Sequence, residues 1–160
     1  MRRLSLTLVA VVATVCGAKA ISDNVSVDYP SDYRTWQHVK SMIIQPGHPL
    51  EEPFGGIHHI YANAKAMSGL SNGQYEDGAI FVFDLLAYDD SNKTIVEKNR
   101  KRIDLMQYDS EQFSATGGWG FDTFVGDSTT ERLVQDVVAS CFDCHATAKA
   151  SNYVFSRYRR

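Results

Sequence analysis

Short runs of apolar residues, several of them alternating with polar ones, dominate the middle of the chain. Residues 57–61 are rich in β-forming side chains, and residues 79–86 form a nearly continuous apolar run after an Asp-Gly turn signal. Residues 94–97 and 101–108 continue the pattern on either side of a charged turn, and residues 119–125 alternate after two glycines. We therefore expect an antiparallel sheet of four or five strands.

Segments with helical spacing flank these runs. In residues 31–42, large apolar side chains recur every three or four positions after two N-cap residues, which predicts a helix. A loop rich in glycine and proline follows. Residues 63–70 and 110–113 are typical of short helices, and residues 130–144 of a longer one. The predicted fold class is α+β, an antiparallel sheet flanked by helices.

The first twenty residues have the three parts of a secretory signal peptide. Two arginines precede an apolar run over residues 4–15, and small residues at positions 18 and 20 form a cleavage site. The run is too short to span a membrane. We therefore expect cleavage before Ile21, a mature single domain of residues 21–160 without a membrane span, and a periplasmic location. A lipid anchor on Cys16 is the alternative.

Net charge and length limit the function classes. The chain carries a formal net charge of −3, and loss of the leader's two arginines and one lysine leaves 13 basic side chains against 19 acidic ones, or −6. An acidic mature surface argues against nucleic acid as a partner, because phosphate backbones are bound by clustered Lys and Arg. About 140 mature residues suffice for one domain with one core.

Near the C-terminus, Cys141-Phe142-Asp143-Cys144-His145 forms a CxxCH run, the attachment signature of c-type haem. Cysteines three residues apart lie on one side of a helical turn, so both sulfurs can reach the two vinyl groups of one haem. The adjacent histidine can then bind the iron. We expect one haem c per chain, attached covalently to Cys141 and Cys144, with His145 as the axial metal ligand.

Two other uses of the cysteine pair are less consistent with the sequence. A zinc site needs two more ligands at a characteristic spacing, and the remaining cysteine, Cys16, lies in the leader. A thioredoxin-like pair opens a helix after a strand, whereas these cysteines close an apolar-periodic segment. Among cytochromes, small electron-transfer types need a methionine after the motif, and none follows His145. Four-helix-bundle types do not accommodate this many strands.

Six motifs cover nearly all of the mature chain: Tyr33-Arg34-x-Trp36, Gly56-Ile57-His58-His59-Ile60-Tyr61-x-Asn63, Asp77-Gly78, Thr116-Gly117-Gly118-Trp119-Gly120-Phe121, the CxxCH run, and Tyr153-Val154-Phe155-Ser156. Together they resemble the cytochrome P-460 family. The resemblance, shared with the family's cytochrome c prime beta relatives, implies an antiparallel sheet with flanking helices, one c-type haem per subunit and a homodimer.

The resemblance also implies that one position separates two kinds of haem protein. Members that oxidise hydroxylamine carry a lysine, cross-linked to the macrocycle, on the strand after the Asp-Gly turn. Phe83 stands at the matching position here and cannot form that bond. We therefore expect Phe83 to form an apolar distal cap, similar to that of the cytochrome c prime beta branch, which binds nitric oxide at an open iron.

Three further residues are candidate site residues. His58 falls where the lysine-bearing relatives carry an arginine, and a strand directs His58 and His59 to opposite faces, so at most one can face the haem. There, His58 could donate a hydrogen bond to a bound diatomic or act as a general acid, unless it is solvated or structural. Asp104 falls near a carboxylate position of the hydroxylamine-oxidising pocket, but we expect a strand carboxylate that faces solvent. Arg34 could pair with a haem propionate or lie solvated.

Three functions remain open at this stage. The first is a haem protein that binds nitric oxide or a related small nitrogen species at an open iron position. The second is an enzyme that oxidises hydroxylamine or turns over peroxide, with His58 or Asp104 moving the proton. The third is simple electron transfer to a periplasmic redox partner, which requires a fixed sixth ligand.

Overall fold

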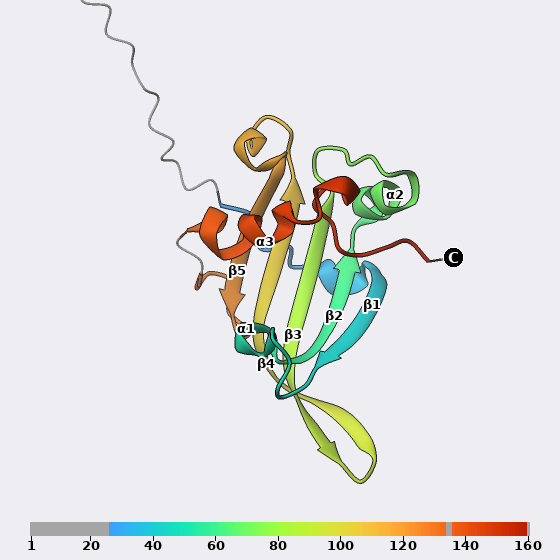
Figure 1. Cartoon of the computed structure of the whole chain (residues 1–160), viewed down its shortest axis with the longest axis vertical. Coiled ribbons are helices and arrows are strands. Elements are labelled where there is room, and N and C mark those ends of the chain that lie inside the picture. The colour runs from blue at the N-terminus through green and yellow to red at the C-terminus, as the bar shows by residue number, and fades with distance from the viewer. Residues whose placement is uncertain (1–25, 134–135, 160) are drawn as a thin grey trace, which may run out of the picture.

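A computed structural model, which describes residues 26–133 and 136–159, contains a five-stranded antiparallel sheet with the strand order β1-β2-β3-β4-β5 (Figure 1). The strands are β1 (Gln37–Ile44), β2 (Gly56–Ala62), β3 (Ile80–Ser91), β4 (Thr94–Tyr108) and β5 (Trp119–Val125). Each strand pairs with the next one in the chain, so the sheet is a simple meander. The predicted α+β class and the upper strand count are confirmed.

Helical segments are short, and they lie before, between and after the strands. They are η1 (Tyr33–Thr35), α1 (Glu51–Phe54), α2 (Ala64–Asn72), η2 (Ser114–Thr116), the π-helical η3 (Val138–Phe142), α3 (Asp143–Ala146) and η4 (Lys149–Ser151). The longest, α2, begins at Asn63, whose side chain accepts a hydrogen bond from the Ala66 amide at 2.9 Å. None of the helices in the described ranges is long and apolar enough to cross a membrane.

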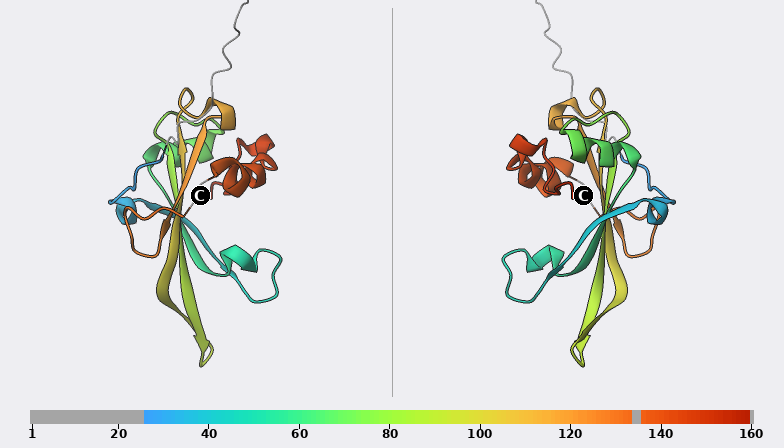
Figure 2. Two further views of the ribbon diagram at one scale, coloured as in Figure 1. Left: turned by 90° about the vertical axis from the view of Figure 1, so that its left-hand side faces the viewer. Right: turned by 90° about the vertical axis from the view of Figure 1, so that its right-hand side faces the viewer.

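The two faces of the sheet carry separate apolar clusters. Figure 2 shows α1 and α3 on one face, called here the α3 face, and the blue η1 segment on the other, the η1 face. Because side chains alternate along each strand, neighbouring residues contribute to different faces. The α3 face buries Ala62, Phe81, Met106, Trp119 and Phe121. The η1 face buries Val27, Tyr33, Val82, Ile103 and Phe124.

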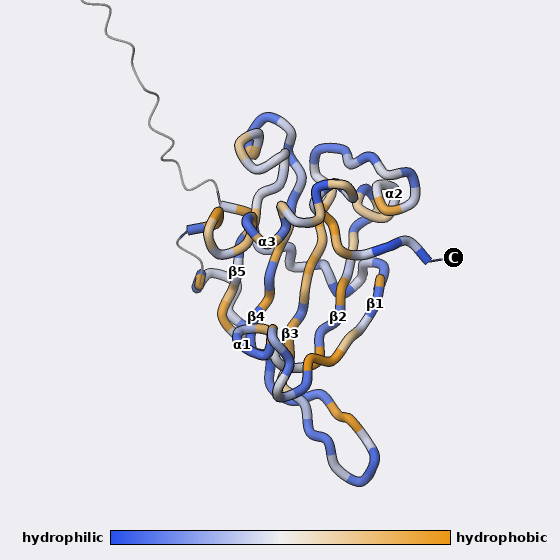
Figure 3. The backbone as a smooth tube through the Cα atoms, viewed as in Figure 1, coloured by the Kyte–Doolittle hydropathy of each residue, from blue (hydrophilic) through white to orange (hydrophobic). Residues whose placement is uncertain are grey.

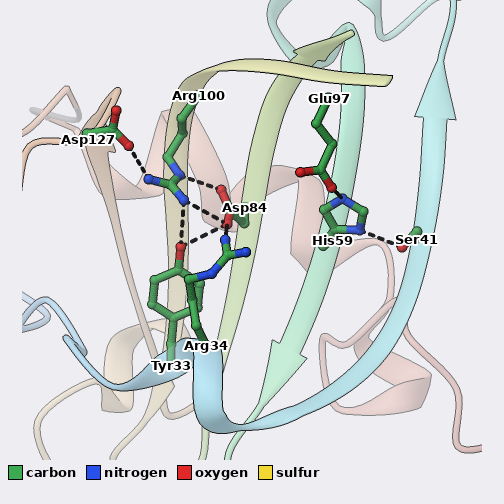
Figure 4. A network of polar contacts seen from close by, with 8 residues as sticks. All are labelled: Tyr33, Arg34, Ser41, His59, Asp84, Glu97, Arg100 and Asp127. Carbon is green, nitrogen blue, oxygen red and sulfur yellow. Dashed lines mark hydrogen bonds and ion pairs between the residues drawn. The ribbon is translucent and has the colours of Figure 1, made fainter. Parts of the chain in front are cut away.

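A polar network stabilises the η1 face (Figure 4). Asp84 is fully buried and accepts hydrogen bonds from the Tyr33 hydroxyl (2.8 Å), from Arg34 Nη1 (3.1 Å) and from Arg100 Nε (2.6 Å). Arg100 also forms an ion pair with Asp127. Burial, together with the bond to Asp84, raises the pKa of the Tyr33 hydroxyl, so it stays a proton donor. The network joins η1, β3 and β4.

The predicted helix over residues 31–42 is wrong. A single 3-10 turn spans Tyr33–Thr35, and the chain then enters β1. The Trp36 indole donates a hydrogen bond of 3.1 Å to the Asp32 carboxylate. This bond stabilises the single turn, and the two residues do not begin a longer helix. Strand pairing with β2 provides the hydrogen bonds that a helix would otherwise supply.

The two other predicted helices after residue 100 also differ from the structure. Residues 110–113 form turns, with the 3-10 segment η2 directly after them. In the segment 130–144, Arg132 forms an isolated β-bridge with Phe124, so helical structure begins only near η3; residues 134–135 lie outside the described residues. The C-terminal helix therefore exists but is shorter than the apolar spacing predicts.

Strands β3 and β4 continue beyond the rest of the sheet as a projecting hairpin (Figure 1). Asn92 and Lys93 at its tip have positive φ angles of 53° and 61°, as in a tight two-residue turn. Figure 3 shows hydrophobic residues along the central strands and a hydrophilic C-terminal tail. The central strands thus present apolar side chains for packing. The segment that carries the CxxCH run lies across the α3 face of the sheet.

Candidate haem site

The two cysteines of the CxxCH run lie on consecutive helical turns. Cys141 belongs to η3 and is half-buried, whereas Cys144 belongs to α3 and is exposed; both are free thiols. Burial raises the pKa of Cys141 to about 11, and the nearby Asp104 carboxylate acts in the same direction. Both sulfurs are thus available as thiols for attachment to one group above the α3 face.

His145 is held in one orientation by the backbone. Its Nδ1 lies 2.7 Å from the Tyr153 carbonyl oxygen, which can only accept a hydrogen bond, so Nδ1 carries the proton and Nε2 keeps a free lone pair. Burial lowers the pKa of His145, which favours the neutral ring. The ring packs against Phe121 at 4.9 Å and Phe155 at 5.1 Å between centroids. A neutral imidazole with one fixed nitrogen is what a metal ligand requires.

Phe83 and His58 lie in contact on the α3 face. His58 pairs with Leu85 across β2 and β3, and its ring centroid is 4.4 Å from that of Phe83. His58 is fully buried, and neither ring nitrogen has a hydrogen-bond partner within the described residues. Burial, with smaller contributions from Lys40 and His59, lowers the pKa of His58 to about 4. It is therefore neutral near pH 7, with a donor and an acceptor unused.

Asp104 also belongs to the α3 face. It lies opposite Phe83 in the β3–β4 pair and accepts hydrogen bonds from Thr123 Oγ1 (2.6 Å) and Arg102 Nε (3.0 Å). Its side chain is only 21% exposed, and burial raises its pKa. The solvent-facing alternative is therefore wrong, because the strand register directs Asp104 to the same face as Phe83.

Comparison with known families agrees with this arrangement. A sequence model of the cytochrome P460 family matches residues 30–156, which is most of the described chain. This chain belongs to the cytochrome P460 family. Membership makes it a haem protein, and the residues on the α3 face fit a haem: two free thiols, a ligand-ready imidazole, aromatic rings and a buried histidine without partners. No curated protein matches the chain.

The cytochrome P460 fold brings further side chains to this face that the sequence did not single out. The Arg102 guanidinium lies 4.6 Å above the ring of Phe54 in α1, and that ring is 6.0 Å from Phe83. Lys40 lies opposite Ile60 across β1 and β2, on the α3 face. These cations could pair with haem propionates. Strand alternation could have found Arg102, but Lys40 lay inside the segment predicted as a helix.

Arg34 lies away from these side chains. It pairs with Asp84 on the η1 face, where Figure 4 shows it beside Arg100. His59 is on that face too, between Glu97 (2.5 Å) and Ser41 (2.6 Å), which confirms that His58 and His59 point to opposite faces. The cytochrome P460 fold thus unites six of the seven predicted site residues on one face and leaves Arg34 on the other.

A zinc centre gains no support from this geometry. Within residues 26–133 and 136–159, no group of three or more His, Cys, Asp and Glu side chains is arranged to hold a metal ion. The α3 face instead combines one imidazole with a free Nε2 and an aromatic surface, a composition that fits a haem.

Proposed function

We propose that this chain is an exported c-type haem protein that binds nitric oxide, or a related small nitrogen species, at the iron position opposite His145. Cys141 and Cys144 would hold the haem through thioether bonds, and His145 would be the axial ligand. In this proposal the chain belongs to the cytochrome c prime beta branch of its family, because Phe83 replaces the cross-linking lysine.

One observation carries the proposal: Phe83 packs against the fully buried His58, whose two ring nitrogens have no partner among the described residues. A buried polar group without a partner is costly and is usually retained for a ligand or a reaction. The neighbouring Phe83 ring is apolar and cannot bind iron. Together they offer an apolar ring and one unused hydrogen-bond donor, which are the two features that a small diatomic ligand would meet here.

His145, Phe83 and His58 have different roles in the proposed binding of the ligand. A haem held here would supply an iron that can bind a small diatomic. His145 would hold that iron through Nε2, since its Nδ1 is committed to the Tyr153 carbonyl. Phe83 limits the size of the ligand that can enter, and neutral His58 can donate a hydrogen bond to it without adding a charge.

Titration of the ferrous protein with nitric oxide, followed by absorption spectroscopy, tests this function. We expect a spectral change at stoichiometric nitric oxide, and roughly tenfold faster association in Phe83→Ala, equal to about 1.4 kcal/mol less steric barrier. Ile95→Ala, an exposed change on the projecting hairpin, is the control and should behave like the wild type. A six-coordinate, low-spin ferrous spectrum that ignores nitric oxide would remove the proposal.

A second candidate function is oxidation of hydroxylamine or turnover of peroxide. It is favoured by Asp104, whose pKa is raised by burial and whose carboxylate lies on the same face as His58. A carboxyl group with a raised pKa can move protons near neutral pH. Steady-state turnover with a dye as electron acceptor would support this candidate if Asp104→Asn abolished it, whereas turnover no faster than that of free haem would exclude it.

Export, attachment and assembly are further parts of the proposal. Intact mass of the mature protein should equal the chain from Ile21 plus one haem, with no additional cross-link. Light scattering should give a homodimer. A chain that retains residues 1–20, or a haem removable by acidified solvent, would contradict export or thioether attachment respectively.

A further inference from the structure

Two successive residues after the CxxCH run adopt a backbone conformation that side chains disfavour. Asn152 and Tyr153 have φ angles of 53° and 66°, both in the left-handed region, and neither is glycine. Such a pair persists only where surrounding contacts hold it, and it is often found at functional sites. This turn is also the part of the chain whose carbonyl oxygen accepts the His145 Nδ1 proton.

Trp119 is the main anchor of this turn. Its indole Nε1 donates a hydrogen bond of 2.9 Å to the Asn152 carbonyl oxygen, and the indole is fully buried. The rings of Tyr75 and Tyr108 pack against it with centroids 4.9 and 5.0 Å away. On the other side of the turn, the side-chain amide of Asn152 donates a hydrogen bond of 2.5 Å to the Gly73 carbonyl oxygen. The turn is therefore fixed at Asn152 by both its carbonyl oxygen and its side-chain amide.

Gly117 provides the space for this arrangement. It has a φ of +67°, and a Cβ atom there would come within 2.5 Å of the Tyr153 ring. A larger residue would displace the ring and the turn that carries it. The Gly117-Gly118-Trp119 motif thus supports the Asn152–Tyr153 turn: Gly117 leaves room for the Tyr153 ring and Trp119 donates a hydrogen bond to Asn152. The sequence alone did not reveal this role.

We propose that Trp119 and Asn152 are positioning residues for His145: by holding the left-handed turn, they aim the Tyr153 carbonyl at Nδ1 and so set how strongly His145 binds the iron. The inference rests on the proposed role of His145 as axial ligand. A firm Nδ1–H···O=C bond makes the opposite nitrogen more basic. His145 then stays bound when nitric oxide occupies the other side of the iron.

The test compares haem-loaded wild-type protein with Trp119→Phe, which keeps an aromatic ring but loses the indole donor. Resonance Raman of the ferrous protein measures the iron–histidine stretch, and absorption spectra measure how much nitrosyl form has lost His145. We expect a lower stretching frequency in Trp119→Phe than in the wild type. In the same variant, the ratio of His145-free to His145-bound nitrosyl form should rise roughly tenfold. Loss of an outer hydrogen-bond partner typically weakens a metal site by at least this factor.

Tyr108→Phe is the matched control, because Tyr108 packs against the same indole and its hydroxyl forms no hydrogen bond with the turn within the described residues. It should leave both readouts unchanged. If Trp119→Phe does not fold, Asn152→Ala and Asn152→Gly decide the matter. Both lose the amide, but only glycine adopts a φ of 53° without penalty, so alanine should shift the stretch further than glycine.

Two outcomes overturn the inference, and they are distinguishable. If the wild type shows no iron–histidine stretch, the five-coordinate ferrous haem with His145 as its ligand, which the proposed function requires, is absent, and the inference fails with it. If the wild type shows the stretch but Trp119→Phe and Asn152→Ala leave both readouts at wild-type values, only the positioning role is wrong.

Discussion

At the scale of single residues, His58 works against stability, because it is buried and has no hydrogen-bond partner in the described part of the chain. Its folded pKa of about 4 lies below the ordinary value of 6.5. Between these values the unfolded chain binds a proton that the folded chain does not, so stability falls as the pH decreases from 6.5 to 4 and is fully present above 6.5. Such a cost is expected of a residue kept for a ligand.

His58→Leu should therefore stabilise the ligand-free, haem-loaded protein. We expect a gain of about 1 kcal/mol at pH 7, where an apolar side chain replaces an imidazole with unsatisfied nitrogens. The gain should grow by about 3 kcal/mol on acidification to pH 4, following the shift in pKa. Denaturant unfolding at several pH values measures both. A variant less stable than the wild type at pH 7 would show that the imidazole has a partner.

Single residues also show the reach and limits of sequence reasoning. The CxxCH spacing assigned Cys141, Cys144 and His145 by local geometry alone, and the structure makes both thiols and the His145 lone pair available. Asp104 needed the strand register to decide its face, and the alternative of a solvent face was wrong. The propionate role of Arg34 could not be judged without the buried Asp84, because 50 residues separate them along the chain.

At the scale of elements, the runs with β-forming residues were predicted well and the helical segments poorly. Strands β2, β3 and β5 follow from local composition, since apolar residues alternate or cluster within each. The charged turn predicted between residues 97 and 101 is wrong, because β4 runs unbroken from Thr94 to Tyr108 and pairs with β3 there. Strand β1 was missed because its apolar spacing also fits a helix, and only pairing with β2 distinguishes the two. The helix predicted over residues 130–144 begins late because Arg132 bridges to Phe124 instead.

The Asp84 network should carry much of the stability of the η1 face, because it joins three elements through a carboxylate without solvent contact. Asp84→Asn weakens the acceptor and leaves the mostly buried Arg100 with only the exposed Asp127 as its charge partner, so we expect a cost of about 3 kcal/mol, the lower end for breaking a buried pair. Asp89→Asn is the control, since Asp89 forms an exposed pair with Lys98 at 3.9 Å and should cost about 0.5 kcal/mol or less. Urea unfolding followed by circular dichroism compares them, and equal costs would contradict the role of burial.

At the scale of the whole molecule, the two faces of one sheet have opposite characters. The η1 face satisfies its own polar groups through Asp84 and Arg100. Among the described residues, the α3 face leaves His58 without a hydrogen-bond partner and Phe155 52% exposed beside His145. A domain with one completed face and one incomplete face is suited to take a large planar group as part of its core, which links the fold to the haem expected of its family.

If the haem completes the α3 face, the segment that carries the CxxCH run should depend on it. Segments η3 and α3 have five and four residues and contain no fully buried side chain. Helices this short are not stable alone. In Cys141→Ser/Cys144→Ser, which cannot attach haem, we expect the sheet to persist while chymotrypsin cleaves after Phe142 roughly tenfold faster or more, equal to a loss of about 1.4 kcal/mol of local stability. Ser140→Ala keeps both cysteines on the same turn and should be cleaved at the wild-type rate; equal resistance of all three proteins would show that the segment folds without haem.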